Sequence, residues 1–180
     1  MSRIIPLLLI VALVAGCGPQ KMTPEEIAKE KKAVEEVAIS YSKSIQAKDT
    51  EGILNLFSKS SELLVLGTDS AEVFKNLDGL KSHFEVDWEL LKLEKFDELR
   101  YLSMQISPDG KLASALFEVP YDLVIAEQMM RALLRLSMTM IKEDNQWHIV
   151  QLMGSIATVG QSSEDLLAKM KEEKAKGAKK

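Results

Sequence analysis

The sequence predicts an α+β domain, with one long N-terminal helix and two shorter helices packed on a strongly curved antiparallel sheet that encloses a cone-shaped hollow. Apolar residues recur at helical spacing early in the chain, and alternating segments separated by turn residues follow from about residue 99. Strands adjacent in sequence favour an antiparallel sheet with helices on one face. With 180 residues, 46% of them hydrophobic, the chain can build one domain core. The expected element order is α-α-β-β-α-β-β-β-β.

The helices are predicted from their caps and their periodicity. Thr23-Pro24-Glu25-Glu26 combines an N-cap threonine, a proline at the first helical position and a glutamate three residues after the cap. The helix that follows is expected to run to about Lys48. Asp49 and Asp78 are expected to cap two shorter helices. The apolar positions are Ile27, Val34, Val37, Ala38, Tyr41 and Ile45 in the first helix, Ile53, Leu54 and Phe57 in the second, and Leu80, Phe84, Trp88 and Leu91 in the third.

The strands are predicted from short apolar or alternating runs bounded by turns. A strand over 62–67 ends at a glycine, and a very short one is expected within 68–79. The four later strands are expected at 99–106, 112–122, about 132–142 and 147–156. Ser107-Pro108-Asp109-Gly110 and Glu143-Asp144-Asn145-Gln146 are turn sequences between them.

The first sixteen residues have the features of a secretory signal. Arg3 precedes an apolar run over 4–14, which is within the roughly 7–15 residues of a signal h-region and short of the about 20 needed to span a bilayer. Val14-Ala15-Gly16-Cys17 resembles the bacterial lipobox, in which the cysteine is acylated and the chain is cut before it. We therefore expect a signal peptide over 1–16 and a lipidated tether over 17–22. A secreted protein cut near Ala15, or an uncleaved anchor, is the alternative.

A lipidated Cys17 places the chain in the bacterial cell envelope, with the membrane as its partner on the extracytoplasmic side. Gly18, rather than an aspartate, resembles lipoproteins of an outer membrane that face the periplasm, where the organism has one. Loss of Arg3 leaves 22 basic and 27 acidic residues, a formal charge of about −5, so no nucleic-acid partner is expected. No second cysteine is present for a disulfide or a thiolate metal site. The last segment, 159–180, is expected to be a charged, flexible tail rich in lysine and glutamate, and helical at most in part.

Three segments together resemble a known family. "AISYSKSIQAKDTEGILNLFS", "LVLGTDSAEVFKNLDGLKSHF" and "RLSMTMIKEDNQWHIVQLMGS" are similar to the SnoaL-like branch of the nuclear transport factor two superfamily over about 33–158, so the domain is expected at 23–158. The resemblance implies the cone-shaped fold. The superfamily includes ketosteroid isomerase, scytalone dehydratase and polyketide cyclases, together with many members of no known activity. The fold therefore does not assign a function.

The last strand supplies most of the expected pocket residues. Simple alternation places Trp147, Ile149, Gln151, Met153 and Ser155 on one face, and His148 on the opposite, outer face. Similar SnoaL-like sequences often carry histidines at the positions of Gln151 and Met153, and this difference argues against reactive chemistry. The ligand-pocket candidates are Trp88, Arg135, Trp147, Gln151, Met153 and Ser155. Ordinary core packing is the alternative for the two tryptophans, and pairing with Glu118 is the alternative for Arg135.

An enzyme remains the second hypothesis. Glu118 in an apolar cone would act as a general acid or base, with Tyr101 or Tyr121 donating a hydrogen bond to an oxyanion. Alternation places Glu118 and Tyr121 on opposite faces, which favours an outward polar face instead. The two histidines lie on separate elements, with His83 expected on a helix surface, so no metal and no other cofactor is expected.

Methionines 129, 130, 138 and 140 form a cluster that suits core filling, apolar ligand binding or homodimerisation through the sheet. The sequence therefore favours non-catalytic binding of a small apolar ligand or a protein partner. An isomerase, cyclase or dehydratase with a buried carboxylate is the alternative, and a structural dimeric envelope protein is the third hypothesis.

Overall fold

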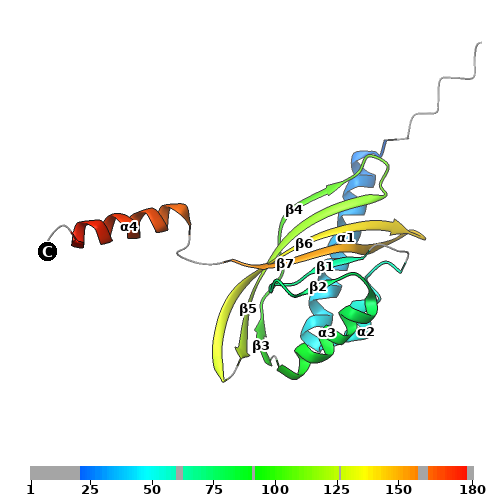
Figure 1. The fold of residues 1–180 in the computed structure, drawn as a ribbon. Coiled ribbons are helices and arrows are strands. Elements are labelled where there is room, and N and C mark those ends of the chain that lie inside the picture. Colours follow the sequence, from blue (N-terminus) through cyan, green and yellow to red (C-terminus); the bar gives the residue numbers. More distant parts are fainter. Residues whose placement is uncertain (1–20, 60–62, 91, 126, 158–161, 178–180) are drawn as a thin grey trace, which may run out of the picture.

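The computed structural model describes residues 21–59, 63–90, 92–125, 127–157 and 162–177. Its helices are α1 (Pro24–Ala47), α2 (Thr50–Leu54), α3 (Leu77–Leu90) and α4 (Ser163–Gly177). Its strands are β1 (Leu64–Leu66), β2 (Val73–Phe74), β3 (Lys92–Phe96), β4 (Arg100–Ile106), β5 (Leu112–Ile125), β6 (Gln128–Glu143) and β7 (Gln146–Ile156). The predicted α+β class is confirmed (Figure 1). Cys17 and the expected signal peptide lie outside the described residues.

The strands form one sheet in the order β2-β1-β7-β6-β5-β3, with β4 also paired to β5. The long, curved hairpin of β5 and β6 is its centre, and β4 and β3 pair with successive parts of β5 (Figure 1). The sheet is mixed rather than purely antiparallel because β1 runs parallel to β7. Strand β3 was not predicted, since its charged sequence, KLEKF, lacks the usual apolar alternation.

The first helix begins at the predicted cap. The Thr23 hydroxyl accepts a hydrogen bond from the Glu26 amide, and the Glu26 carboxylate accepts one from the Thr23 amide, which completes a capping box. The helix ends at Lys48, whose left-handed backbone (φ 54°) closes the last turn. Asp49 caps α2 by accepting a hydrogen bond from the Gly52 amide.

The core lies between α1 and the concave face of the sheet. Buried side chains from α1 and the segment after α2 meet those of β5, β6 and β7, and the largest fully buried ones include Ile53, Phe57, Phe117, Met138, Met140 and Ile149. Met138 and Met140 are therefore ordinary core residues, whereas Met129, beside the β5–β6 turn, is 71% exposed.

The tail forms a helix, α4, over Ser163–Gly177, where the sequence predicted at most partial helicity. Its apolar side chains, Leu166, Leu167 and Met170, are about half exposed. Within the described part of the chain, no helix combines the length and the apolar character needed to cross a bilayer.

Candidate functional site

A cavity of about 330 Å³ lies inside the cone, between α1, α3, the β1–β2 segment and the concave face of the sheet. Most of its wall is aliphatic or aromatic. The apolar lining includes Ile45, Phe74, Phe84, Trp88, Phe96, Leu136, Leu152 and Ile156. Such a wall can bury a small apolar molecule, because each Å² of apolar surface removed from water contributes about 25 cal/mol.

One part of the wall is polar. His83 and Asp87 lie one turn apart on α3, and Nε2 of His83 is 3.4 Å from Oδ2 of Asp87. Tyr41 of α1 and Glu72 also line the cavity. Backbone amides of Thr68 and Asp69 donate hydrogen bonds to Oε2 of Glu72, at 2.7 and 3.1 Å, and hold its carboxylate at the β1–β2 turn.

Burial shifts the pKa values of several side chains in this wall. The pKa of Asp87 is raised because burial disfavours the carboxylate; the nearby His83 opposes this shift and Glu72 reinforces it. Burial, together with the negative charge of Asp87, raises the pKa of Tyr41, which stays a neutral phenol. Burial also raises the pKa of Tyr121. The polar groups therefore include hydrogen-bond donors as well as carboxylates.

The prediction of a helix-surface role for His83 is wrong. Its ring stacks on Phe74, with the two centroids 4.6 Å apart, and its side chain is 19% exposed. The helix turns His83 and Asp87 toward β2 and the cavity, beside the stripe of Leu80 and Phe84. The i, i+4 spacing of a histidine and an aspartate next to that stripe is the sequence signal that would have found this pair.

The predicted face of the last strand is wrong beyond Ile149. Thr139 of β6 pairs with Gln151, but its neighbour Met140 pairs with Ile149, so Val150 is an extra residue in β7. This β-bulge shifts the alternation by one residue. Gln151, Met153 and Ser155 consequently lie on the exposed outer face, and Met153 is 49% exposed. Their neighbours Leu152, Gly154 and Ile156 line the cavity instead.

Glu118 and Arg135 also lie on the outer face of the sheet. Glu118 accepts hydrogen bonds from Arg135 Nε at 2.8 Å and Arg100 Nη2 at 3.0 Å. Its side chain is only 10% exposed, although both arginines are half exposed. Glu118 and Arg135 therefore do not face the cavity. The prediction of Arg135 as a pocket residue is wrong, and the alternative, pairing with Glu118, is the arrangement observed.

The aromatic candidates divide between three places. Trp88 and Tyr121 line the cavity, and the Trp88 indole donates a hydrogen bond to Thr50 Oγ1 at 2.8 Å. Trp147 is a buried core residue whose indole donates to Glu30 Oε2 at 2.8 Å. Tyr101 is half exposed beside a separate hollow of about 290 Å³ between α1 and residues 97–101.

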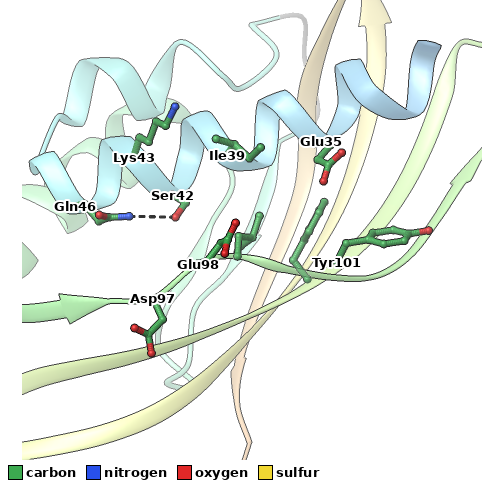
Figure 2. Close-up of a pocket in the computed structure, with 10 residues that line it drawn as sticks. Glu35, Ile39, Ser42, Lys43, Gln46, Asp97, Glu98 and Tyr101 are labelled. Atoms are coloured by element: carbon green, nitrogen blue, oxygen red, sulfur yellow. Dashed lines mark hydrogen bonds between the residues drawn. The ribbon is translucent and has the colours of Figure 1, made fainter. Parts of the chain in front are cut away.

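Figure 2 shows this second hollow, with Glu35 and Ser42 of α1 on one side and Glu98 and Tyr101 on the other. Gln46 donates a long hydrogen bond of 3.5 Å to the Ser42 hydroxyl. The wall carries charged groups of both signs, since Lys43 also belongs to it. We therefore take the apolar cavity inside the cone as the functional site. No group of three or more potential metal ligands occurs within the residues that the structure describes.

The sequence matches the family model of the SnoaL-like domain over residues 34–159. The chain belongs to this family. Among solved structures, a ketosteroid isomerase-like protein from Erwinia carotovora atroseptica superposes with a TM-score of 0.64 at 12% identity, covering 76% of this chain and 99% of that one. A protein of unknown function from Mycobacterium tuberculosis gives 0.59 at 18% identity, covering 82% of this chain and 88% of that one.

A cystatin-like protein of unknown function from Nostoc punctiforme gives a TM-score of 0.53 at 15% identity, covering 77% of this chain and 96% of that one. At these identities the structural similarities establish the cone fold only. No curated protein matches the chain. The SnoaL-like fold is therefore established, and the site must be interpreted from its own residues.

Proposed function

We propose that this SnoaL-like domain binds a small, mainly apolar molecule inside the cone. The observation that carries the proposal is the cavity of about 330 Å³ with an aromatic and aliphatic wall and one polar end. Its volume is at the lower end of the about 300–1,000 Å³ of small-molecule sites. A molecule with one or two rings has a suitable size.

The charges at the polar end restrict the ligand. Asp87 and Glu72 bring carboxyl groups to the wall, so an anionic ligand group would meet like charges in a partly desolvated site. A neutral hydroxyl or carbonyl group avoids this repulsion. It can also exchange hydrogen bonds with His83 and the Tyr41 phenol.

Fluorescence provides a direct test, because Trp88 is in the cavity wall and the second tryptophan, Trp147, can be replaced by phenylalanine. We expect 2-naphthol to change the fluorescence of Trp88 saturably. The anion 2-naphthoate should bind about tenfold more weakly or worse, corresponding to at least about 1.4 kcal/mol of repulsion. Equal affinities for the two compounds would contradict the conclusion that the carboxyl groups at the polar end of the cavity repel an anionic ligand.

Two leucine substitutions on one strand give a matched control. An added Cβ at Gly154 would have only ordinary contacts of 3.8 Å, so Gly154→Leu extends a side chain into the cavity without backbone strain. Ser155→Leu adds the same group on the outer face. We expect Gly154→Leu to abolish 2-naphthol binding and Ser155→Leu to preserve it. Unchanged binding by Gly154→Leu would exclude the cavity as the site.

Proton transfer is a second candidate function, favoured by the 3.4 Å contact of His83 with Asp87 at the cavity wall. In this arrangement the carboxylate orients the imidazole, and the imidazole removes a proton from a carbon next to a ketone. The phenol of Tyr41 would donate a hydrogen bond to the enolate oxygen. The ketone 2-tetralone tests this function, since proton exchange into D₂O is visible by NMR. Exchange no faster with the protein than with His83→Ala would exclude it.

The proposal includes an envelope location, with the domain held by a lipid on Cys17. Its support is the order of a basic start, an apolar run, small residues and a single cysteine. Labelled palmitate should enter the wild-type chain in a bacterial host, and Cys17→Ser should yield an unlabelled protein released from membranes. Equal labelling of the two chains would overturn the lipid anchor.

A further inference from the structure

We infer that the lipid-anchored protein faces the membrane with the end that carries the β4–β5 and β6–β7 turns, and that the cavity lies at the opposite end of the domain. We call the first the turn end; it comprises the start of α1, the β4–β5 turn at 107–111 and the β6–β7 turn at 144–145. This inference rests on the lipid anchor at Cys17 proposed above. It adds the orientation of the binding site relative to the membrane.

The chain is fixed to the turn end as soon as the tether finishes. The Met22 amide donates a hydrogen bond of 3.2 Å to the Pro108 carbonyl in the β4–β5 turn. The Met22 side chain lies over Gly110, so closely that a Cβ there would be 2.6 Å from its sulfur. The capping box at Thr23 then starts α1. The attachment point is therefore part of the rigid domain.

A second set of contacts joins α1 to the other turn. Glu30, in the second turn of α1, accepts hydrogen bonds from Lys142 Nζ at 2.6 Å and from the Trp147 indole at 2.8 Å. The Lys142 amide also donates to the Lys111 carbonyl at 2.9 Å, which ties the two hairpins together. The start of α1 and both turns consequently move as one unit.

The tether is short compared with the domain. Cys17 and Met22 are five positions apart, so even a fully extended chain separates them by at most about 18 Å. Along β5, nine residues separate Leu112 at the turn end from Tyr121 at the cavity, or about 30 Å. Along α1, eighteen residues separate Thr23 from Tyr41, or about 27 Å. Helix and strand therefore place the residues that line the cavity at the far end of the domain.

The tether, rather than charge, sets this orientation. Exposed acidic residues lie beside the cavity on α3 and also at the turn end, so the negative potential of anionic lipids repels both ends: Asp78, Glu85 and Glu89 on α3, and Glu25, Glu26 and Asp109 at the turn end. The tether keeps the turn end within at most about 18 Å of the lipid, which is shorter than the about 27–30 Å from that end to the cavity. The domain therefore stands on its turn end, and the cavity takes its ligand from the aqueous side.

Site-specific labelling tests this orientation on the full lipidated chain. Since Cys17 is the only cysteine and its thiol would be acylated, one added cysteine carries one fluorophore. Lys111→Cys labels the turn end and Glu85→Cys labels α3; both native side chains are exposed. The proteins are inserted into vesicles of phosphatidylethanolamine and phosphatidylglycerol that contain a lipid with a headgroup nitroxide, which quenches nearby fluorophores.

We expect several-fold stronger quenching at position 111 than at position 85. A flexible Gly/Ser insertion of about 20 residues between Gln20 and Lys21, with a root-mean-square length of about 25 Å, should largely remove the difference. Equal quenching without the insertion, or stronger quenching at position 85, in a chain that floats with the vesicles would overturn the orientation and leave the anchor intact. A chain that neither carries palmitate nor floats with the vesicles would overturn both.

Discussion

His83 and Asp87 lie one turn apart on α3, with Nε2 and Oδ2 separated by 3.4 Å, and form the polar part of an otherwise apolar cavity wall. Burial raises the pKa of Asp87 above its ordinary value of 3.8, although His83 opposes the shift. The folded protein therefore holds this proton more tightly than the unfolded chain, and the free energy of unfolding decreases as pH rises from about 3.8 through the raised pKa.

Asp87→Asn should consequently make the protein more stable at neutral pH, because it removes a partly buried charge. The gain should shrink as the pH falls through the raised pKa, and it should level off below pH 3.8, where the wild-type carboxyl is protonated in both the folded and the unfolded state. Urea unfolding over a series of pH values measures this, with Glu85→Gln on the exposed face of α3 as control. A loss of stability at neutral pH would contradict the conclusion that burial destabilises the Asp87 carboxylate.

Glu30→Gln tests the contacts that hold α1 to the turn end. Burial alone would raise the pKa of Glu30, but hydrogen bonds from Lys142 and Trp147 outweigh it and lower this pKa below 4.5. Its stabilisation is therefore present above pH 4.5 and is lost as pH falls through the lowered value. We expect the substitution to cost about 1–2 kcal/mol at pH 7 and to flatten the acid side of the stability profile.

The control for Glu30 is Glu36→Gln, on the same helix and exposed, which should leave both quantities nearly unchanged. Chemical unfolding at several pH values below 7 is the measurement. If Glu30→Gln and Glu36→Gln gave the same profile, the contacts of Glu30 would contribute nothing to stability.

Glu118→Gln tests whether Glu118 contributes to ligand binding in the cavity or only to ion pairs on the outer face of the sheet. Its two arginine partners are about half exposed, so screening limits the expected loss of stability to about 1 kcal/mol. Because the carboxylate faces away from the cavity, the affinity for 2-naphthol should stay unchanged. Titration of Trp88 fluorescence measures it. Loss of binding without loss of stability would show that Glu118 belongs to the binding site.

Gly110→Ala tests the β4–β5 turn. The backbone of Gly110 has φ 68°, which costs a residue with a Cβ about 1–2 kcal/mol, and Met22 must also move aside. Gly154→Ala is the matched substitution, since its Cβ meets only ordinary contacts. Thermal unfolding should show a clear loss for Gly110→Ala and little change for Gly154→Ala. Equal effects would mean that the turn conformation is not needed.

Sequence patterns predicted the elements that depend on neighbours along the chain. The capping box at Thr23, the Asp49 cap and the turns near Pro108 and Asn145 act within a few residues, so each could be recognised locally. The bulge at Val150 could not, because it depends on which residue of β6 each residue of β7 faces. A shift of one residue moved three predicted pocket positions to the outer surface.

The cone-shaped α+β class and the family membership follow from the linear chain, as does the order of helices and strands apart from β3. Caps, turns and apolar periodicity can be recognised because they depend on residues close together in the sequence. The composition of the cavity wall depends instead on long-range pairing. Parallel pairing of β1 with β7 and the packing of α3 against β2 bring Tyr41 of α1, Glu72 of the β1–β2 turn, and His83 and Asp87 of α3 to one hollow. No local pattern specifies which faces meet, since side-chain direction is set by strand register and helix docking.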